Sequence, residues 1–250
     1  WHGSDIHTLP YISPYLKELT TSIIQNANAN CFVSRDLMLK SNVLCQANNK
    51  YVLYNGVDRM KFHKFNNFEI KRFKKEYNID NNVKNVAFLG NLFHIKNVLC
   101  LPSIFSIVQK KYPLQCHFIG SGSLKNDLER LCIEYKINYR FWGYQNSEKM
   151  PSIINCMDMI ILPSYNEGLP LVSLEALACG VPMVASRVGG IAEAIGEENT
   201  VSLNRNFTEN MANLIIEKLS KPQNVSVPEC FSWETTSRTE CNIIKKIMGL

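Results

Sequence analysis

The feature that most constrains the fold is a regular alternation of short apolar runs and helix-like segments from residue 83 onward. The apolar runs are continuous, which is typical of strands that are buried on both faces of a parallel sheet. We therefore predict an α/β fold with a complete Rossmann-like, doubly wound parallel sheet over residues 83–230. The predicted strands are Val86–Leu89, Leu114–Ile119, Tyr139–Trp142, Met159–Leu162, Met183–Ser186 and Thr200–Leu203.

Segments with helical spacing of apolar residues fill the intervals and follow the last strand. A doubly wound domain binds its ligands at the carboxyl ends of its strands, so the candidate site loops are those after Leu89, Ile119, Trp142, Leu162 and Ser186. The predicted helices are Val98–Lys110, Leu124–Lys136, a segment from Ser147 to about Cys156, Leu171–Cys179, Phe207–Leu219 and Thr235–Ile247.

The residues before 83 contain too few elements for a second domain of this kind. Two strand-like runs, Cys31–Val33 and Tyr51–Tyr54, flank one helix-like segment, Arg35–Leu44. We interpret residues 1–57 as the last part of an N-terminal, acceptor-side Rossmann-like domain whose first half precedes this chain. Residues 58–82 are expected to form a basic linker, and residues 231–250 a C-terminal helix that crosses back to the N-terminal domain.

Charge and composition exclude several classes. The chain has 27 Lys and Arg against 22 Asp and Glu, and a run from Lys61 to Glu76 holds six basic and two acidic residues. A solvated helix face explains that run, which also suits peripheral contact with an anionic membrane surface. No nucleic-acid recognition motif accompanies it, so we expect no nucleic-acid partner. Nine cysteines without a CxxC pair favour free thiols in a reducing, cytoplasmic setting.

The most informative stretch is 164–180, which joins a predicted strand to a predicted helix. Glu167 falls in the loop, and Pro170 suits the first helical position because its missing N–H would be unpaired there. The free amides of the loop are then expected to form an anion-binding helix N-terminus that points into the crevice. These amides belong to Gly168, Leu169 and Leu171.

Glu175 is the only charged residue between Leu169 and Ala178. A lone carboxylate in a buried helix is unfavourable unless it is paired. The vicinal hydroxyls of a ribose would satisfy both carboxylate oxygens, as acidic residues do in dinucleotide sites. A structural ion pair with a distant Lys or Arg is the alternative for Glu175, and a simple interaction with the helix dipole is the alternative for Glu167.

Glu167 and Glu175 together form an E-x7-E pattern that resembles the retaining glycosyltransferases of family four, which have the GT-B fold. The order and spacing of further segments resemble the same family across nearly the whole chain. The resemblance implies transfer of a sugar, with retention, from a UDP- or GDP-type diphosphate donor to a glycan or lipid-linked acceptor. The segments are HGSD at 2–5, YNGVD at 54–58, FLGNL at 88–92, IKN at 95–97, FIGSG at 118–122, FWGY at 141–144, LPS at 162–164, PMVAS at 182–186 and GGIAE at 189–193.

The resemblance also implies roles for single residues. Lys96 would hold the donor diphosphate, Glu167 would face the hydroxyls of the transferred sugar, and His2 would contact that sugar from the N-terminal side. These three are the predicted catalytic residues, and Glu175 would hold the ribose. The predicted donor-binding set is Gly90, Asn91, Lys96, Trp142, Gly143, Tyr144, Glu167, Gly168, Leu169, Pro170, Leu171 and Glu175.

Two departures from the family pattern concern the phosphate site. Asn91 stands where the family commonly has Arg, and Asn97 where it often has Gly. We expect the phosphate to be held more weakly or by other groups. Because the chain has no Asp-x-Asp motif, we also expect no metal and no cofactor, with Lys96 and the helix N-terminus stabilising the leaving group.

Two other classes of protein fit parts of the pattern. A dehydrogenase is disfavoured because Gly120–Lys125 has Lys where the dinucleotide fingerprint needs its last Gly. A nucleotide-sugar-binding module without independent catalysis stays open, because most of the expected acceptor domain is not in this chain. Such a module would bind the nucleotide through residues 83–230 and transfer little sugar.

Overall fold

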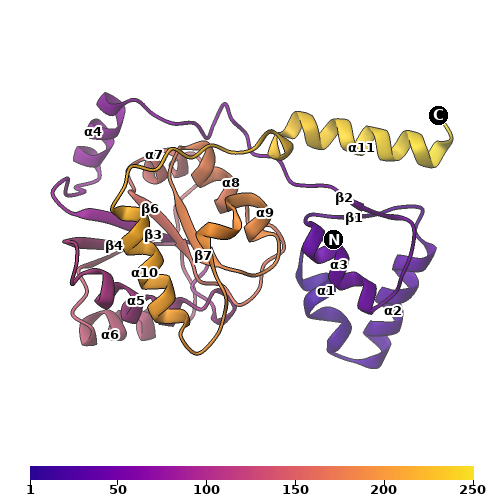
Figure 1. Ribbon diagram of the computed structural model, residues 1–250, viewed down its shortest axis with the longest axis horizontal. Helices are drawn as coiled ribbons and strands as arrows, with labels where there is room; N and C mark the ends of the chain where they lie inside the picture. Colours follow the sequence, from indigo (N-terminus) through magenta and orange to yellow (C-terminus); the bar gives the residue numbers. More distant parts are fainter.

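The computed structural model describes residues 1–250, which form two α/β units and a long C-terminal helix (Figure 1). In the N-terminal unit, strands β1 (Asn30–Phe32) and β2 (Lys50–Val52) pair in parallel. The hydroxyl of Ser34 caps the helix after β1 by accepting the amide of Leu37. The helices of this unit are α1 (Ser4–His7), α2 (Pro14–Asn26) and α3 (Arg35–Lys40).

The C-terminal unit is built on a six-stranded parallel sheet in the order β5-β4-β3-β6-β7-β8. The first three strands are therefore added in one direction and the last three in the other, which is the Rossmann strand order. The predicted doubly wound parallel sheet is confirmed. Its strands are β3 (Lys84–Leu89), β4 (Leu114–Ile119), β5 (Tyr139–Gly143), β6 (Met159–Leu162), β7 (Met183–Ser186) and β8 (Thr200–Val201).

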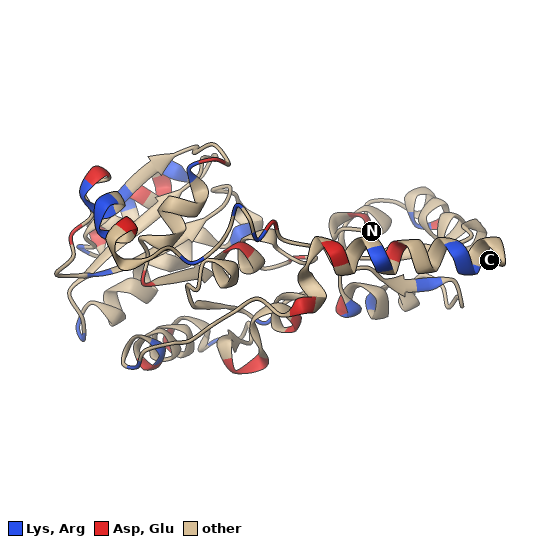
Figure 2. Cartoon of the chain, turned by 90° about the horizontal axis from the view of Figure 1, so that it is seen from above, with Lys and Arg blue, Asp and Glu red and all other residues tan.

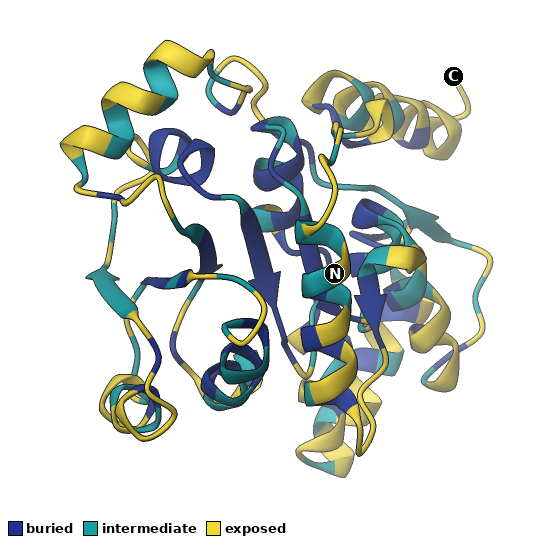
Figure 3. Cartoon of the chain, turned by 60° about the vertical axis from the view of Figure 1, so that its left-hand side comes forward, coloured by how far each residue is buried: buried dark blue, intermediate teal, exposed yellow.

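Strand β8 is shorter than the predicted Thr200–Leu203. Its two residues pair with Ala185 and Ser186, and β7 ends at Ser186. The chain beyond Val201 therefore has no neighbouring strand to pair with. The central strands β3, β4, β6 and β7 are buried almost throughout, whereas the edge strand β5 is half-buried (Figure 3).

Helices cover both faces of the large sheet (Figure 1). On one face α5 packs against α6 and α10, and on the other α4, α7, α8 and α9 pack in succession. The predicted helix Val98–Lys110 opens with a separate 3₁₀ turn and is α-helical only from Leu101, with Pro102 in its first turn. The bounds are α5 (Leu101–Val108), α6 (Lys125–Glu134), α7 (Met150–Asn155), α8 (Leu171–Ala178), α9 (Ile191–Ile195) and α10 (Phe207–Leu219).

The basic run of the sequence contains helix α4 (Asn67–Glu76), which has no buried residue. A complete capping box starts it. The Asn66 side chain accepts the backbone amide of Glu69, and the Glu69 side chain accepts the backbone amide of Asn66. The Lys and Arg residues of this region lie at the end of the molecule away from the N-terminal unit (Figure 2).

The C-terminal helix α11 (Trp233–Met248) lies along the N-terminal unit (Figure 1). Gly56 passes directly under it, because a Cβ atom at Gly56 would lie 2.5 Å from the Trp233 amide nitrogen. The hydroxyl of Thr236 donates to the carbonyl oxygen of Tyr54 at 2.9 Å. None of the helices combines the length and the apolar character that crossing a membrane requires.

Candidate functional site

The connections after β3 and β6 diverge at the middle of the sheet. These strands are neighbours, yet the helix after β3 covers one face and the helix after β6 covers the other. Such a switch point opens a crevice at the carboxyl ends of the strands. Lys96, from the segment after β3, and Glu167, from the loop after β6, meet there, with Nζ and Oε1 2.7 Å apart. The structure thus brings together two of the three predicted catalytic side chains.

The carboxylate of Glu167 is fixed by a second donor. The Ser164 hydroxyl donates to the same Oε1 at 2.6 Å, and the carbonyl of Ser164 accepts the Ser186 hydroxyl at 2.5 Å. The Glu167 side chain is 9% exposed and that of Lys96 24%. A carboxylate held between an ammonium and a hydroxyl is rigid, whereas the ammonium keeps access to solvent and to a ligand. Ser164 belongs to the LPS segment that resembles the family, but no pattern in the sequence assigned it a role.

The turn that carries Lys96 explains the departure at Asn97. This residue has φ of 51°, in the left-handed region where glycine is favoured and asparagine is the best-tolerated alternative. Its side-chain amide also donates to the carbonyl of Pro163 at 3.2 Å, and the amide of Tyr165 donates to the carbonyl of Ile95 at 2.9 Å. The loops that carry Lys96 and Glu167 are therefore bonded to each other.

The loops after β3 and β4 touch backbone to backbone beside this pair. A Cβ atom at Gly120 would lie 2.0 Å from the Gly90 carbonyl oxygen, and one at Gly122 would lie 2.4 Å from the Leu92 carbonyl oxygen. Only glycine permits this approach. Asn91 lies between these contacts and is exposed.

Helix α8 begins at Leu171, as predicted, but Pro170 does not occupy the first helical position. Pro170 has ψ of 122° and is the N-cap, so the first helical residue is Leu171. The reason is that an extended residue at 170 lets its carbonyl accept the amide of Ser173 at 3.0 Å. Gly168 and Leu169 are buried, whereas Leu171 is 47% exposed.

Glu175 has no hydrogen-bond or ion-pair partner in the chain, so the structural ion pair considered for it is not formed. Burial raises the pKa of its carboxyl, and the charge of Lys61 opposes this shift. Lys61 itself pairs with Glu148, Nζ to Oε1 at 2.8 Å. Glu175 lines a cavity of about 170 Å³ together with Gly56, Val57, Asp58, Phe62, Leu171 and Trp233.

Trp142 has a structural role that the sequence did not indicate. Its indole Nε1 donates to Nδ1 of the buried His117 at 3.1 Å, and His117 Nε2 donates to the side-chain oxygen of Asn85 at 3.0 Å. Burial, aided by the charge of Arg140, lowers the pKa of His117 to about 3, so the ring is neutral. The Arg140 guanidinium covers the Trp142 ring at 4.1 Å.

Gly143 and Tyr144, the predicted donor-binding residues that follow Trp142, differ in exposure. The carbonyl of Gly143 accepts the amide of Gly120 at 2.9 Å, and Gly143 has φ of 67°. The Tyr144 side chain is 78% exposed. With the Trp142 ring and indole N–H both engaged in the fold, the groups left to meet a ligand here are backbone atoms and Tyr144.

The first residues of the chain lie against the loop of Glu167. A Cβ atom at Gly168 would lie 1.9 Å from the His2 carbonyl oxygen, so the two backbones are in contact. The His2 side chain is exposed, and its amide donates to the Asp5 carboxylate at 2.9 Å. His7, which sequence reasoning missed, is half-buried with its Nε2 unpartnered, and its pKa is lowered chiefly by burial. No spacing or motif distinguishes His7 in the sequence.

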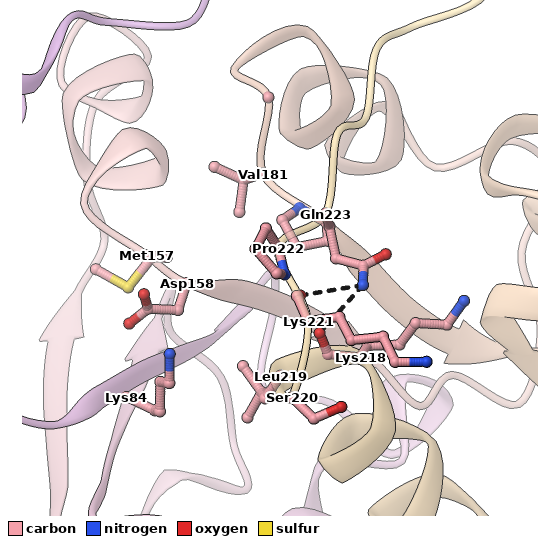
Figure 4. Close-up of a pocket in the computed structure, with 12 residues that line it drawn as sticks. Lys84, Met157, Asp158, Val181, Lys218, Leu219, Ser220, Lys221, Pro222 and Gln223 are labelled. Carbon is pink, nitrogen blue, oxygen red and sulfur yellow. Dashed lines mark hydrogen bonds between the residues drawn. The ribbon is translucent and has the colours of Figure 1, made fainter.

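A different cavity, of about 410 Å³, lies at the opposite edge of the sheet (Figure 4). It is bordered by Lys84, which begins β3, and by Asp158, which precedes β6. The Gln223 side-chain amide donates to the carbonyls of Lys218 and Lys221, both at 3.2 Å (Figure 4). This cavity is at the amino ends of the strands, where doubly wound sheets do not hold their ligands, so we place the site at Lys96 and Glu167.

A Rossmann-like sheet with charged groups at its switch point defines a nucleotide-binding class of α/β protein. The chain belongs to the glycosyl transferases group 1 family, whose model matches residues 69–229, more than half of the chain. This finding confirms that the family resemblance seen in the sequence is right at the level of glycosyl transferases group 1.

Curated relatives and solved structures agree with this family. The N-acetyl-alpha-D-glucosaminyl L-malate synthase of Bacillus anthracis is 28% identical over 200 residues, covering 80% of this chain and 51% of that protein. The putative teichuronic acid biosynthesis glycosyltransferase TuaC of Bacillus subtilis is 24% identical over 227 residues, covering 89% of this chain and 56% of that protein. The chain thus spans about half the length of these relatives.

Among solved structures, Anabaena Alr3699/HepE in complex with UDP superposes with a TM-score of 0.83 at 17% identity, covering 98% of this chain and 71% of that one. Sucrose-phosphate synthase from Thermosynechococcus elongatus gives a TM-score of 0.77 at 18% identity, covering 97% of this chain and 64% of that one. These likenesses confirm the predicted GT-B fold.

Proposed function

We propose that this chain holds the donor site of a retaining, metal-independent glycosyltransferase. It would move a sugar from a nucleoside diphosphate to a glycan or lipid-linked acceptor. The observation that carries this proposal is the contact of Lys96 Nζ with Glu167 Oε1, 2.7 Å apart at the switch point of the sheet. One cation and one carboxylate at that point match the two parts of a sugar nucleotide, the diphosphate and the sugar hydroxyls.

Lys96 would stabilise the leaving diphosphate. The charge that develops on the phosphate as the glycosidic bond breaks must be neutralised by groups that are already in place. The Lys96 ammonium is partly exposed, so it can turn from Glu167 to a phosphate oxygen without leaving the crevice. The first amides of α8 add a favourable dipole on the same side. This pair of charge contributions supports the proposal that no metal ion is needed.

Glu167 would orient the transferred sugar. Its Oε1 is held by Ser164 and Lys96, so the second oxygen is free to accept a sugar hydroxyl. His2 reaches the same loop from the N-terminal unit, where its backbone contacts Gly168. We propose that the sugar lies between these two groups. Retention of anomeric configuration follows from the family resemblance, and the anomer of the product tests it.

Glu175 would bind the ribose through its two oxygens. It is a half-buried carboxylate without a partner on the wall of a cavity, and ribose hydroxyls would supply the missing hydrogen bonds. The HepE structures contain UDP and UDP-glucose, which supports a UDP-type donor for this chain too. We further propose that basic helix α4 makes a peripheral contact with anionic membranes, which co-sedimentation with anionic and neutral vesicles tests.

The experiment that tests the proposed function compares binding with transfer. Calorimetric titration with UDP and GDP measures binding, and release of UDP from UDP-sugars, with and without an acceptor panel and EDTA, measures turnover. We expect UDP binding, and EDTA-resistant turnover that Lys96→Met abolishes. The exposed Lys110→Met is the matched control. UDP binding without any transfer would favour the binding-module alternative, and no nucleotide binding would refute the proposal.

A further inference from the structure

The segment GGIAE at 189–193 resembles the family, yet the proposed chemistry assigns it no role. Its last residue, Glu193 on α9, reaches across to the N-terminal unit. The carboxylate accepts the Arg35 amide at 3.0 Å, the Asp36 amide at 2.9 Å and the Tyr54 hydroxyl at 2.8 Å. All three donors belong to the other unit, at least 139 residues away in the sequence.

These contacts are specific to a carboxylate at this position. The two amides open helix α3 and have no partner inside that helix, so they need an acceptor from elsewhere. Ser34 provides one for the next amide, of Leu37, at 3.1 Å. Burial and the hydrogen bond to Glu193 together raise the pKa of Tyr54 to about 12, so its hydroxyl remains a donor at any physiological pH.

The loop in front of Glu193 touches the predicted sugar site. The Gly190 amide donates to the Gly168 carbonyl at 2.6 Å, and a Cβ atom at Gly189 would lie 2.0 Å from the Glu167 carbonyl oxygen. A Cβ atom at Gly190 would also lie 2.5 Å from the Ser34 side chain. The two glycines are therefore packed between the loop of Glu167 and the start of α3.

We propose that Glu193 is a positioning residue that sets how closely the N-terminal unit approaches the loop of Glu167. By tying α9 to α3 and to Tyr54, it keeps His2 in contact with Gly168, where the donor sugar is expected. The inference rests on the proposed function for the identity of that sugar site. A residue that only capped α3 would affect the local amides and leave the approach of the two units unchanged.

The test compares Glu193→Ala and Glu193→Gln with a matched control, Glu198→Ala. Glu198 lies five residues on, is exposed and makes no contact with the N-terminal unit. Glu193→Gln keeps the shape of the side chain, so it guards against misfolding of the alanine variant. Three quantities are measured on the 250-residue chain: the radius of gyration by small-angle scattering, amide exchange at 2–8 and 35–36, and the ratio of UDP-glucose to UDP affinity.

For Glu193→Ala we expect a larger radius of gyration and faster exchange at both segments. The preference for UDP-glucose over UDP should fall about five- to twentyfold, with UDP affinity itself within twofold. Glu193→Gln should give a smaller change in the same direction. If the radius of gyration is unchanged and exchange is faster at 35–36 alone, the proposal is wrong and Glu193 only caps helix α3. If no nucleotide binds, the proposed function fails, but scattering and exchange at 2–8 still decide the role of Glu193.

Discussion

Replacing Glu175 by Gln separates a binding role from a structural one, because the two roles predict opposite changes. The carboxylate has no partner in the unliganded chain, and burial raises its pKa. Glu175→Gln removes a half-buried, unpaired charge at nearly constant volume, so we expect the free energy of unfolding to rise. The expected weakening of UDP binding is about 1.5–3 kcal/mol, the contribution of one hydrogen bond to a charged group. That corresponds to roughly 10- to 150-fold in Kd.

The stability change should depend on pH in a defined direction. Because the pKa of Glu175 is higher in the folded chain than its ordinary 4.5, the charged form opposes folding at neutral pH. That opposition disappears as the pH falls below about 4.5, so the advantage of Glu175→Gln is greatest near neutrality. Calorimetry with UDP and urea unfolding from pH 7 to 4 measure both effects. Glu217→Gln, an exposed change on α10, is the control.

A variant that is less stable than the parent and binds UDP normally would refute this reasoning. It would mean that Glu175 has a stabilising partner in solution and that the ribose is held elsewhere.

Four further predictions concern Lys96, Trp142, His117 and Asn97. Lys96→Met should weaken UDP binding at least tenfold and leave uridine binding unchanged, because Lys96 is assigned to the diphosphate; equal losses for both ligands would contradict that assignment. Trp142→Phe removes the N–H that His117 accepts, so urea unfolding should show a loss of about 1–3 kcal/mol with unchanged UDP affinity. His117 has a folded pKa of about 3, so stability should fall as the pH drops below 6.5, by up to about 1.4 kcal/mol per unit, and His117→Gln should flatten that slope. Asn97→Gly should stay within about 0.5 kcal/mol of the parent, whereas Asn97→Val should lose about 1–2 kcal/mol because φ is 51°, and thermal unfolding of both checks this.

The C-terminal sheet was predictable because its strands are buried on both faces. Leu114–Ile119, Met159–Leu162 and Met183–Ser186 match the predicted bounds, since continuous apolar runs closed by turn residues leave little choice of register. Helices α1 and α2 were not predicted, because only one or two residues of each are buried and the sequence shows little apolar periodicity. The short β8 depended on where its neighbour β7 ends.

The site was predictable only in part. Glu167 and Lys96 could be expected at one crevice, because the carboxyl ends of parallel strands share one edge of the sheet. Their direct contact and the partners of Glu193 could not, because both depend on how segments 71 or more residues apart meet. The Ser164 hydroxyl bonds Glu167 only three residues away, but that bond depends on the exact conformation of the loop. The hydrogen bond between Trp142 and His117 could not be predicted either, because it depends on how side chains of two neighbouring strands are oriented.

Amide exchange of the 250-residue chain with and without UDP maps where the nucleotide binds. If the donor site is at Lys96 and Glu167, we expect new protection in the segments around 90–97, 143–145 and 164–175, at the carboxyl ends of the strands. Protection confined to the opposite edge, around Lys84, Asp158 and Lys218 in the cavity of Figure 4, would contradict it.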